Sequence, residues 1–144
     1  MSEKTHTLVI DAKGIILGRL CAYVAKKALL GYTVDVVNVE QAIVSGGRKD
    51  ILEKYKRLRE LGGPLHGPYM GRSSRDLFKR TLERMLPHKK ARGIEAFSRV
   101  KAYKGLPLRY KDAPLETLSF AHVSKLPNTK YLRLAEITSY LGGK

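Results

Sequence analysis

The sequence predicts an α/β domain with parallel strands, because two runs rich in apolar residues flank an amphipathic helix near the N-terminus. Residues 8–10 form a short apolar run and residues 34–39 a β-branched one, both typical of buried strands. Between them, residues 17–30 carry apolar side chains at the i, i+3, i+4 and i+7 spacing of a helix with one buried face. A strand, a helix and a strand within about thirty residues make a βαβ unit, whose strands are parallel.

Periodicity and turn residues predict further elements along the rest of the chain. They are, in order, a strand at 42–44, helices at 48–60, 74–86 and 88–98, a strand at 100–104, short extended segments at 118–123 and 131–134, and a terminal helix at 135–141. No internal repeat, low-complexity segment or domain boundary interrupts this order. The 144 residues are therefore expected to form one domain, residues 1–144.

The two helices predicted at 74–86 and 88–98 meet at Pro87, which ends the first or starts the next turn of helix. Ser73 or Ser74 is expected to cap the first helix. The side chains expected to face inward are Leu77, Phe78, Leu82, Met85 and Leu86 in the first helix, and Ala91, Ile94 and Phe97 in the second.

Positive charge is concentrated in the middle of the chain. The formal net charge is +15, and residues 48–111 hold 19 of the 28 Lys and Arg residues but only 6 of the 13 Asp and Glu residues. An excess of positive residues within one segment of the sequence is expected of a protein that binds a polyanion. An ordinary solvated surface mixes residues of both signs. With 43% hydrophobic residues, the chain can also build a core, which excludes a disordered basic tail.

Membrane and secreted proteins are disfavoured by the sequence. No apolar run approaches the ~20 residues that span a bilayer, and residues 1–7 lack the apolar stretch of a signal peptide. Cys21 is the single cysteine, so no intrachain disulfide can form. We therefore expect a cytoplasmic protein.

Enzymatic and cofactor sites are weakly supported. Gly14 and Gly18 follow a strand and open a helix, but the fingerprint G-x-G-x-x-G is absent, so they are expected to serve a tight turn and close helix–strand packing instead. Cys21 falls on the apolar stripe of its helix and is expected to be an inert buried thiol. We expect no catalytic residue, no cofactor and no small-molecule substrate; a nucleotide-dependent enzyme on a Rossmann-like sheet stays the alternative.

Metal binding is also disfavoured. No two histidines are spaced for a metal site, and one cysteine cannot make a thiolate cluster. The histidines are His6, His66, His88 and His122.

A nucleic acid is the predicted polyanion. Between Arg72 and Arg109, cations recur at intervals of one to seven residues over two predicted helices and a strand, unlike the single helix face of a membrane-surface segment. Arginine offers a planar fork to phosphate oxygens and lysine a mobile point charge. The basic residues predicted to bind RNA are Arg48, Lys49, Arg72, Arg75, Lys79, Arg80, Arg84, Lys89, Lys90, Arg92, Arg99 and Lys101.

Glycine and proline punctuate residues 62–71, which predicts a long loop without regular structure. Tyr69 in this loop is the best candidate for stacking on a base or ribose, and His66 is a further candidate contact.

Several sequence motifs resemble the large-subunit ribosomal protein L13 family. The most specific is the run from Arg84 through Met85-Leu86-Pro87 and the basic residues after it to Phe97, continuing over residues 99–107. Residues 10–20 and 37–46 resemble the family in the same order, so the match covers nearly the whole chain. Residues 140–144 resemble the archaeal branch, and the chain lacks the long C-terminal extension typical of eukaryotic members.

The resemblance implies a three-layer α/β/α fold with a four-stranded parallel sheet, Rossmann-like, and a structural role in the large ribosomal subunit without catalysis. It implies large-subunit ribosomal RNA and neighbouring large-subunit proteins as partners, and no homo-oligomer is expected. RNA contact is carried over to Arg84, His88, Lys89, Lys90, Arg92, Arg99, Lys101 and Lys104. A basic regulator that binds nucleic acid outside the ribosome is the remaining alternative.

Overall fold

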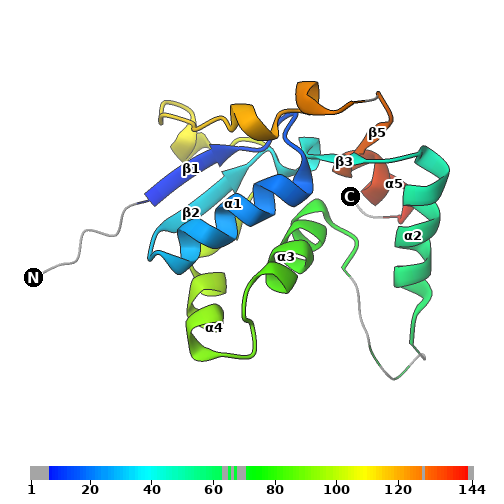
Figure 1. The fold of residues 1–144 in the computed structure, drawn as a ribbon, viewed down its shortest axis with the longest axis horizontal. Helices are drawn as coiled ribbons and strands as arrows, with labels where there is room; N and C mark the ends of the chain where they lie inside the picture. Colours follow the sequence, from blue (N-terminus) through cyan, green and yellow to red (C-terminus); the bar gives the residue numbers. More distant parts are fainter. Residues whose placement is uncertain (1–6, 63–64, 66, 68–70, 128, 143–144) are drawn as a thin grey trace, which may run out of the picture.

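A computed structural model describes residues 7–62, 65, 67, 71–127 and 129–142. The candidate contacts Tyr69 and His66 lie outside the described residues. The predicted βαβ unit is confirmed: β1 (Thr7–Asp11) and β2 (Thr33–Val37) pair in parallel, joined by α1 (Leu17–Leu29) (Figure 1).

Among the described residues, the parallel sheet has three strands in the order β1-β2-β4, not the four that the resemblance implies. Its third strand, β4 (Val100–Ala102), pairs with the other edge of β2. At the outer edge of β1, a single parallel bridge joins Ile10 to Glu116, whose backbone N–H donates to the Val9 carbonyl at 2.8 Å. The pairing beside β1 does not extend beyond this bridge. Pro114, two residues before Glu116, has no backbone N–H to donate, and the residues around it form turns.

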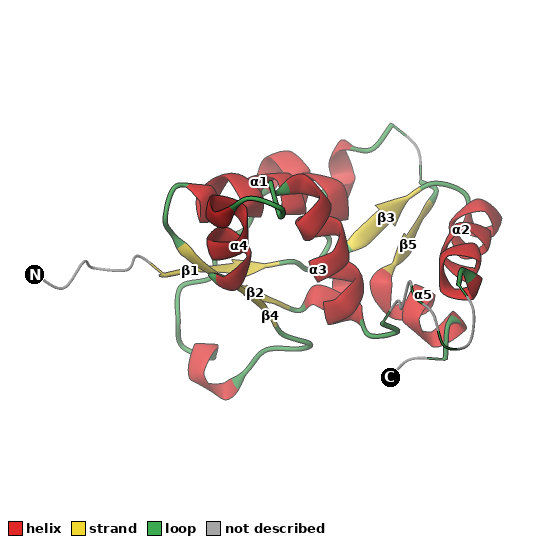
Figure 2. Ribbon diagram, turned by 90° about the horizontal axis from the view of Figure 1, so that it is seen from below, coloured by secondary structure: helices red, strands yellow, loops and turns green. Residues whose placement is uncertain are grey.

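The strand predicted at 42–44 leaves the parallel sheet. Asn38 has a left-handed backbone with φ 55°, which asparagine tolerates better than most residues, and it turns the chain after β2. The following strand, β3 (Ile43–Ser45), pairs antiparallel with β5 (Tyr131–Arg133) in a separate two-stranded sheet. Helices α2 (Arg48–Glu60) and α5 (Leu134–Tyr140) lie beside this pair (Figure 2).

Three helices cover one face of the parallel sheet (Figure 2). They are α1, α3 (Ser74–Met85) and α4 (Ala91–Ser98). Alternate strand residues such as Val34 and Val36 join Leu20, Phe78 and Leu82 in the core, as the period of two along a strand requires. Cys21 is fully buried among them, and burial raises the pKa of its thiol to about 12, which agrees with an inert side chain.

In the described part of the chain, no α-helix covers the opposite face of the sheet at β2, where a three-layer fold predicts one. There Asp35 accepts a hydrogen bond from the hydroxyl of Tyr110, which belongs to a 3-10 turn (Leu108–Tyr110). The extended segment predicted at 118–123 is also wrong, because two further 3-10 turns, Ser119–Ala121 and Val123–Lys125, take its place.

The predicted start of α3 is confirmed at Ser73. Its hydroxyl oxygen accepts from the backbone N–H of Asp76 at 3.2 Å, and its O–H donates to the Asp76 carboxylate at 2.8 Å. This reciprocal pair resembles a capping box and fixes where the helix begins.

Three predicted inward positions are wrong. Met85 is 42% exposed, Ile94 is 58% exposed, and Ala91 is exposed as well. Helix α4 instead buries Gly93 and Ala96, because its small side packs against the chain at Pro87. Small residues allow that close approach, and it turns Ile94 to the surface.

Candidate nucleic-acid interface

Most of the predicted RNA-binding side chains are exposed. They lie on the first turn of α2, along α3, at the corner between α3 and α4, on α4, and on and after β4. The exposed members are Arg48, Lys49, Arg72, Arg75, Arg84, His88, Lys89, Lys90, Arg92, Lys101 and Lys104.

The corner between α3 and α4 projects three of these side chains. Leu86 is buried and anchors the corner, and the backbone N–H of Lys90 donates to the Pro87 carbonyl at 2.9 Å. Between these fixed points, His88, Lys89 and Lys90 point to solvent. The corner therefore presents adjacent basic side chains on a backbone held by its own hydrogen bonds.

Gly93 supports this corner, a role that the sequence did not reveal. A Cβ atom at residue 93 would lie 2.0 Å from the Pro87 carbonyl oxygen and 2.3 Å from the Pro87 carbonyl carbon. Its backbone has no left-handed φ, so glycine is needed for space rather than for conformation. Any side chain there would push the first turn of α4 away from the corner.

Lys79 is turned inward, although it belongs to the predicted RNA-binding set. Its ammonium donates to the carbonyls of Val100 at 2.5 Å and Phe97 at 3.3 Å, and lies 4.1 Å from the centre of the Phe97 ring. Burial, reinforced by the neighbouring Arg75, lowers the pKa of Lys79. The side chain ties α3 to the junction between α4 and β4.

Arg99 makes a comparable tie. Its guanidinium donates to the carbonyl of Ala28, near the end of α1, at 2.9 Å. A second nitrogen lies 3.8 Å from the carboxylate of Glu95, one helical turn earlier. Arg99 is half-buried, so part of its charge is committed to holding α4 against α1.

Lys101 lies on the other side of the sheet from α3 and α4. Its neighbours Val100 and Ala102 are buried on the helical face, so Lys101 points to the opposite face together with its register partner Asp35. Arg109, which the sequence analysis did not single out, joins them there. Its guanidinium lies 4.8 Å from the centre of the Tyr110 ring and 5.0 Å from that of Tyr103. The cations predicted to bind RNA thus lie on both sides of the parallel sheet.

Asp35 is a buried carboxylate on this second face. It is 4% exposed, and its Oδ1 atom has no hydrogen-bond partner among the described residues. Burial raises the pKa of Asp35 above its ordinary value of 3.8, although Arg109 and Lys101 oppose the shift. The folded protein therefore binds this proton more tightly than the unfolded chain.

We expect Asp35→Asn to change the pH dependence of stability. The stabilising contribution of protonated Asp35 is present in full below the ordinary pKa of 3.8 and is lost as pH rises through the raised pKa. The neutral amide of the variant keeps an acceptor for Tyr110 and is not deprotonated. The free energy of unfolding of Asp35→Asn should therefore exceed that of the wild type only slightly at pH 4, and by a growing amount toward pH 7. Urea unfolding of both proteins across this pH range measures the difference. A difference in the free energy of unfolding that stays constant with pH would contradict a raised pKa of Asp35 in the folded protein.

Other classes of site find little support in the described part of the chain. There, no group of three or more His, Cys, Asp or Glu residues could hold a metal ion. None of its described helices is long and apolar enough to cross a membrane. Gly14 occupies a tight turn with φ +71°, as predicted. The close packing predicted at Gly18 is wrong, because a Cβ atom there would meet nothing within 4 Å.

Comparison with known proteins gives a consistent result. The family model described as Ribosomal protein L13 matches residues 5–109, which include the corner and both of its helices. Large ribosomal subunit protein uL13 of Methanosarcina barkeri is 42% identical over 137 residues, covering 94% of this chain and 98% of that protein. The same protein of Haloarcula marismortui is 40% identical over 142 residues, covering 99% and 95%. That of Methanococcoides burtonii is 40% identical over 136 residues, covering 94% and 98%.

Proposed function

Since the chain belongs to the ribosomal protein L13 family, we propose that it is a structural component of the large ribosomal subunit that binds large-subunit ribosomal RNA. Membership of this family makes it a structural protein and not an enzyme, and places it with cytoplasmic ribosomes. Neighbouring large-subunit proteins are its further proposed partners, and we propose that it acts as a single copy. Residues 48–111 form its proposed RNA-binding region within one domain.

The observation that carries this proposal is the exposed basic surface running over α3, the corner and α4. Seven predicted contacts are exposed along this stretch of the chain. They are Arg72, Arg75, Arg84, His88, Lys89, Lys90 and Arg92. Neutralising backbone phosphates with such side chains releases counterions, which supplies affinity without reading base sequence.

The remaining predicted contacts divide by environment. Arg48 and Lys49 begin α2, while Lys101 and Lys104 lie on and beyond β4, so they suit separate RNA segments. Lys79 and Arg99 are proposed to position α4 against the core, because their charged groups are bound to carbonyls of the protein. A rigid scaffold that directs cations to several segments recognises mainly RNA shape.

We expect Lys89→Ala combined with Lys90→Ala to weaken retention in the large subunit without unfolding the domain. Each lost phosphate contact removes a release of counterions that favours binding, so the variant should bind more weakly and leave washed subunits at lower salt than the wild type. The measurement is sedimentation of tagged protein in a sucrose gradient, with increasing potassium chloride in the wash. The thermal midpoint of the isolated variant should stay close to that of the wild type.

Lys26→Ala is the matched control, because Lys26 is an exposed lysine of α1 outside the proposed region. Wild-type protein found mainly at the top of the gradient would contradict the ribosomal role and favour the free regulator. Equal salt resistance of the double variant and the control would remove the corner from the interface.

A further inference from the structure

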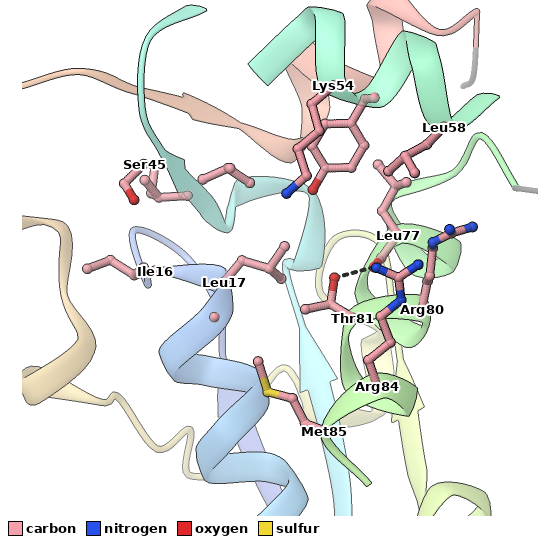
Figure 3. Close-up of a pocket in the computed structure, with 14 residues that line it drawn as sticks. Ile16, Leu17, Ser45, Lys54, Leu58, Leu77, Arg80, Thr81, Arg84 and Met85 are labelled. Carbon is pink, nitrogen blue, oxygen red and sulfur yellow. Dashed lines mark hydrogen bonds between the residues drawn. The ribbon is translucent and has the colours of Figure 1, made fainter. Parts of the chain in front are cut away.

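A cavity of about 350 Å³ opens between α1, β3, α2 and α3 (Figure 3). Its volume lies near the lower end of the range for small-ligand sites, about 300–1,000 Å³. Its walls are largely apolar and include Leu17, Ile43, Leu58 and Leu77. It is therefore large enough for one small group with an apolar face, and too small for a dinucleotide.

Three cations surround this apolar cavity. Lys54 extends into the space between the helices from α2, and Arg84 extends into it from α3, one turn after Arg80 (Figure 3). None of the described residues that line the cavity is acidic, and none of the three cations has a carboxylate partner among the described residues. Like charges gathered without a counter-charge repel one another, and an anionic group placed between them would relieve that repulsion.

Gly18 on the cavity wall gives an independent indication of a ligand. It lies in the first turn of α1 with an ordinary helical backbone, where alanine would favour the helix by about 1 kcal/mol. A Cβ atom at this position would meet nothing within 4 Å, so no contact within the protein requires glycine. Glycine at such a place allows another molecule to approach the backbone closely.

We propose that this cavity receives one unpaired nucleotide of ribosomal RNA, with its base against the apolar wall and Gly18 and its phosphate near Lys54, Arg80 and Arg84. The inference rests on the proposed function and assigns it a specific contact. A nucleotide joins a flat apolar face to an anion, which matches an apolar wall beside three cations. An inorganic anion would leave the apolar wall unused. Arg80 and Arg84 also lie on α3, so the cavity adjoins the proposed RNA surface.

Gly18→Leu tests the steric part of this proposal, with Ala22→Leu as the matched control. Residue 22 is exposed one turn further along α1 and does not line the cavity. Leucine is a good helix former, better than glycine and only slightly worse than alanine, so Gly18→Leu should unfold at or above the wild-type temperature and Ala22→Leu close to it. We expect Gly18→Leu to bind the rRNA fragment that the wild type protects from nuclease roughly tenfold more weakly, the scale of one lost base contact. Ala22→Leu should bind like the wild type.

Lys54→Ala and Lys26→Ala test the charge part in the same assay. Both lysines are exposed, Lys54 on α2 and Lys26 on α1 outside the proposed RNA-binding region, but only Lys54 lines the cavity, so only Lys54→Ala should weaken binding substantially. Base-specific probing with dimethyl sulfate should show one nucleotide that the wild type shields and that becomes reactive with Gly18→Leu and Lys54→Ala. The two controls should leave that nucleotide shielded.

The outcomes separate this inference from the function on which it rests. Wild-type protein that fails to bind the fragment would overturn the proposed function itself. Normal binding by Gly18→Leu, or weaker binding with no nucleotide newly reactive, would overturn the cavity assignment. A thermal shift of the isolated wild type with micromolar AMP, abolished by Gly18→Leu, would make a free nucleotide the ligand and overturn the RNA source.

Discussion

Gly93→Ala is expected to destabilise the domain and weaken RNA binding, although it removes no charge. The added methyl group would lie 2.0 Å from the Pro87 carbonyl oxygen, and this atom belongs to backbone that cannot rotate away. Overpacking of this kind typically costs about 1–3 kcal/mol, and here it must shift either α4 or the corner. Urea unfolding measures the stability loss, and fragment binding under folding conditions measures the displacement of His88, Lys89 and Lys90.

Gly18→Ala is the matched control for stability, because it also adds a methyl group to a helical glycine. Its Cβ atom meets nothing within 4 Å, so the free energy of unfolding should rise or stay constant. If Gly93→Ala were as stable as the wild type, the corner would have to yield without cost. In that case its geometry would not be fixed by the contact between Gly93 and Pro87.

Leu82→Ala should produce the opposite combination, a large loss of stability with little change in RNA affinity of the folded protein. Leu82 is fully buried where α3 packs on the core. Truncating a buried leucine costs about 2–5 kcal/mol, through lost transfer free energy and the cavity left behind. Chemical unfolding at 10 °C measures the loss, and fragment binding at the same temperature measures the affinity of the folded protein.

Glu83→Ala is the control for that experiment, since Glu83 is the next residue of α3 and is exposed. Its effect should stay within about 0.5 kcal/mol. A weaker RNA affinity of folded Leu82→Ala, beyond the unfolded fraction, would show that small changes in the core already disturb the cationic surface.

The bounds of α1 and α2 could be predicted well because each of these helices has one clear apolar stripe. The predicted bounds of α2 match the structure, and Ser73 marks the start of α3 through its side chain. That the parallel sheet has three strands instead of four could not be predicted, because strand pairing depends on the direction of the chain after Asn38. Asn38 turns the chain with a left-handed backbone, and the strand that follows, β3, pairs with β5 instead of joining the parallel sheet.

The positions of the charges could be predicted, but not how each is used. Lys79 and Lys90 are alike in sequence, yet one ammonium is bound to two carbonyls while the other points to solvent. The difference arises from tertiary packing around Phe97, which no local pattern encodes. The cavity was missed for the same reason, because Gly18, Lys54 and Arg84 come together only when α1, α2 and α3 are packed.

The pairing of β3 with β5 has a consequence for the order in which the molecule takes shape during its own translation. Residues 43–45 leave the exit tunnel long before residues 131–133, which are their hydrogen-bonding partners. Until then, β3 presents unpaired backbone groups, and the buried residues Leu134 and Ile137 of α5 are absent from the core. A contact between such distant segments closes late, because loop closure costs entropy before the contact compensates. Newly made chains should therefore acquire the βαβ half first and complete the cavity wall at β3 last.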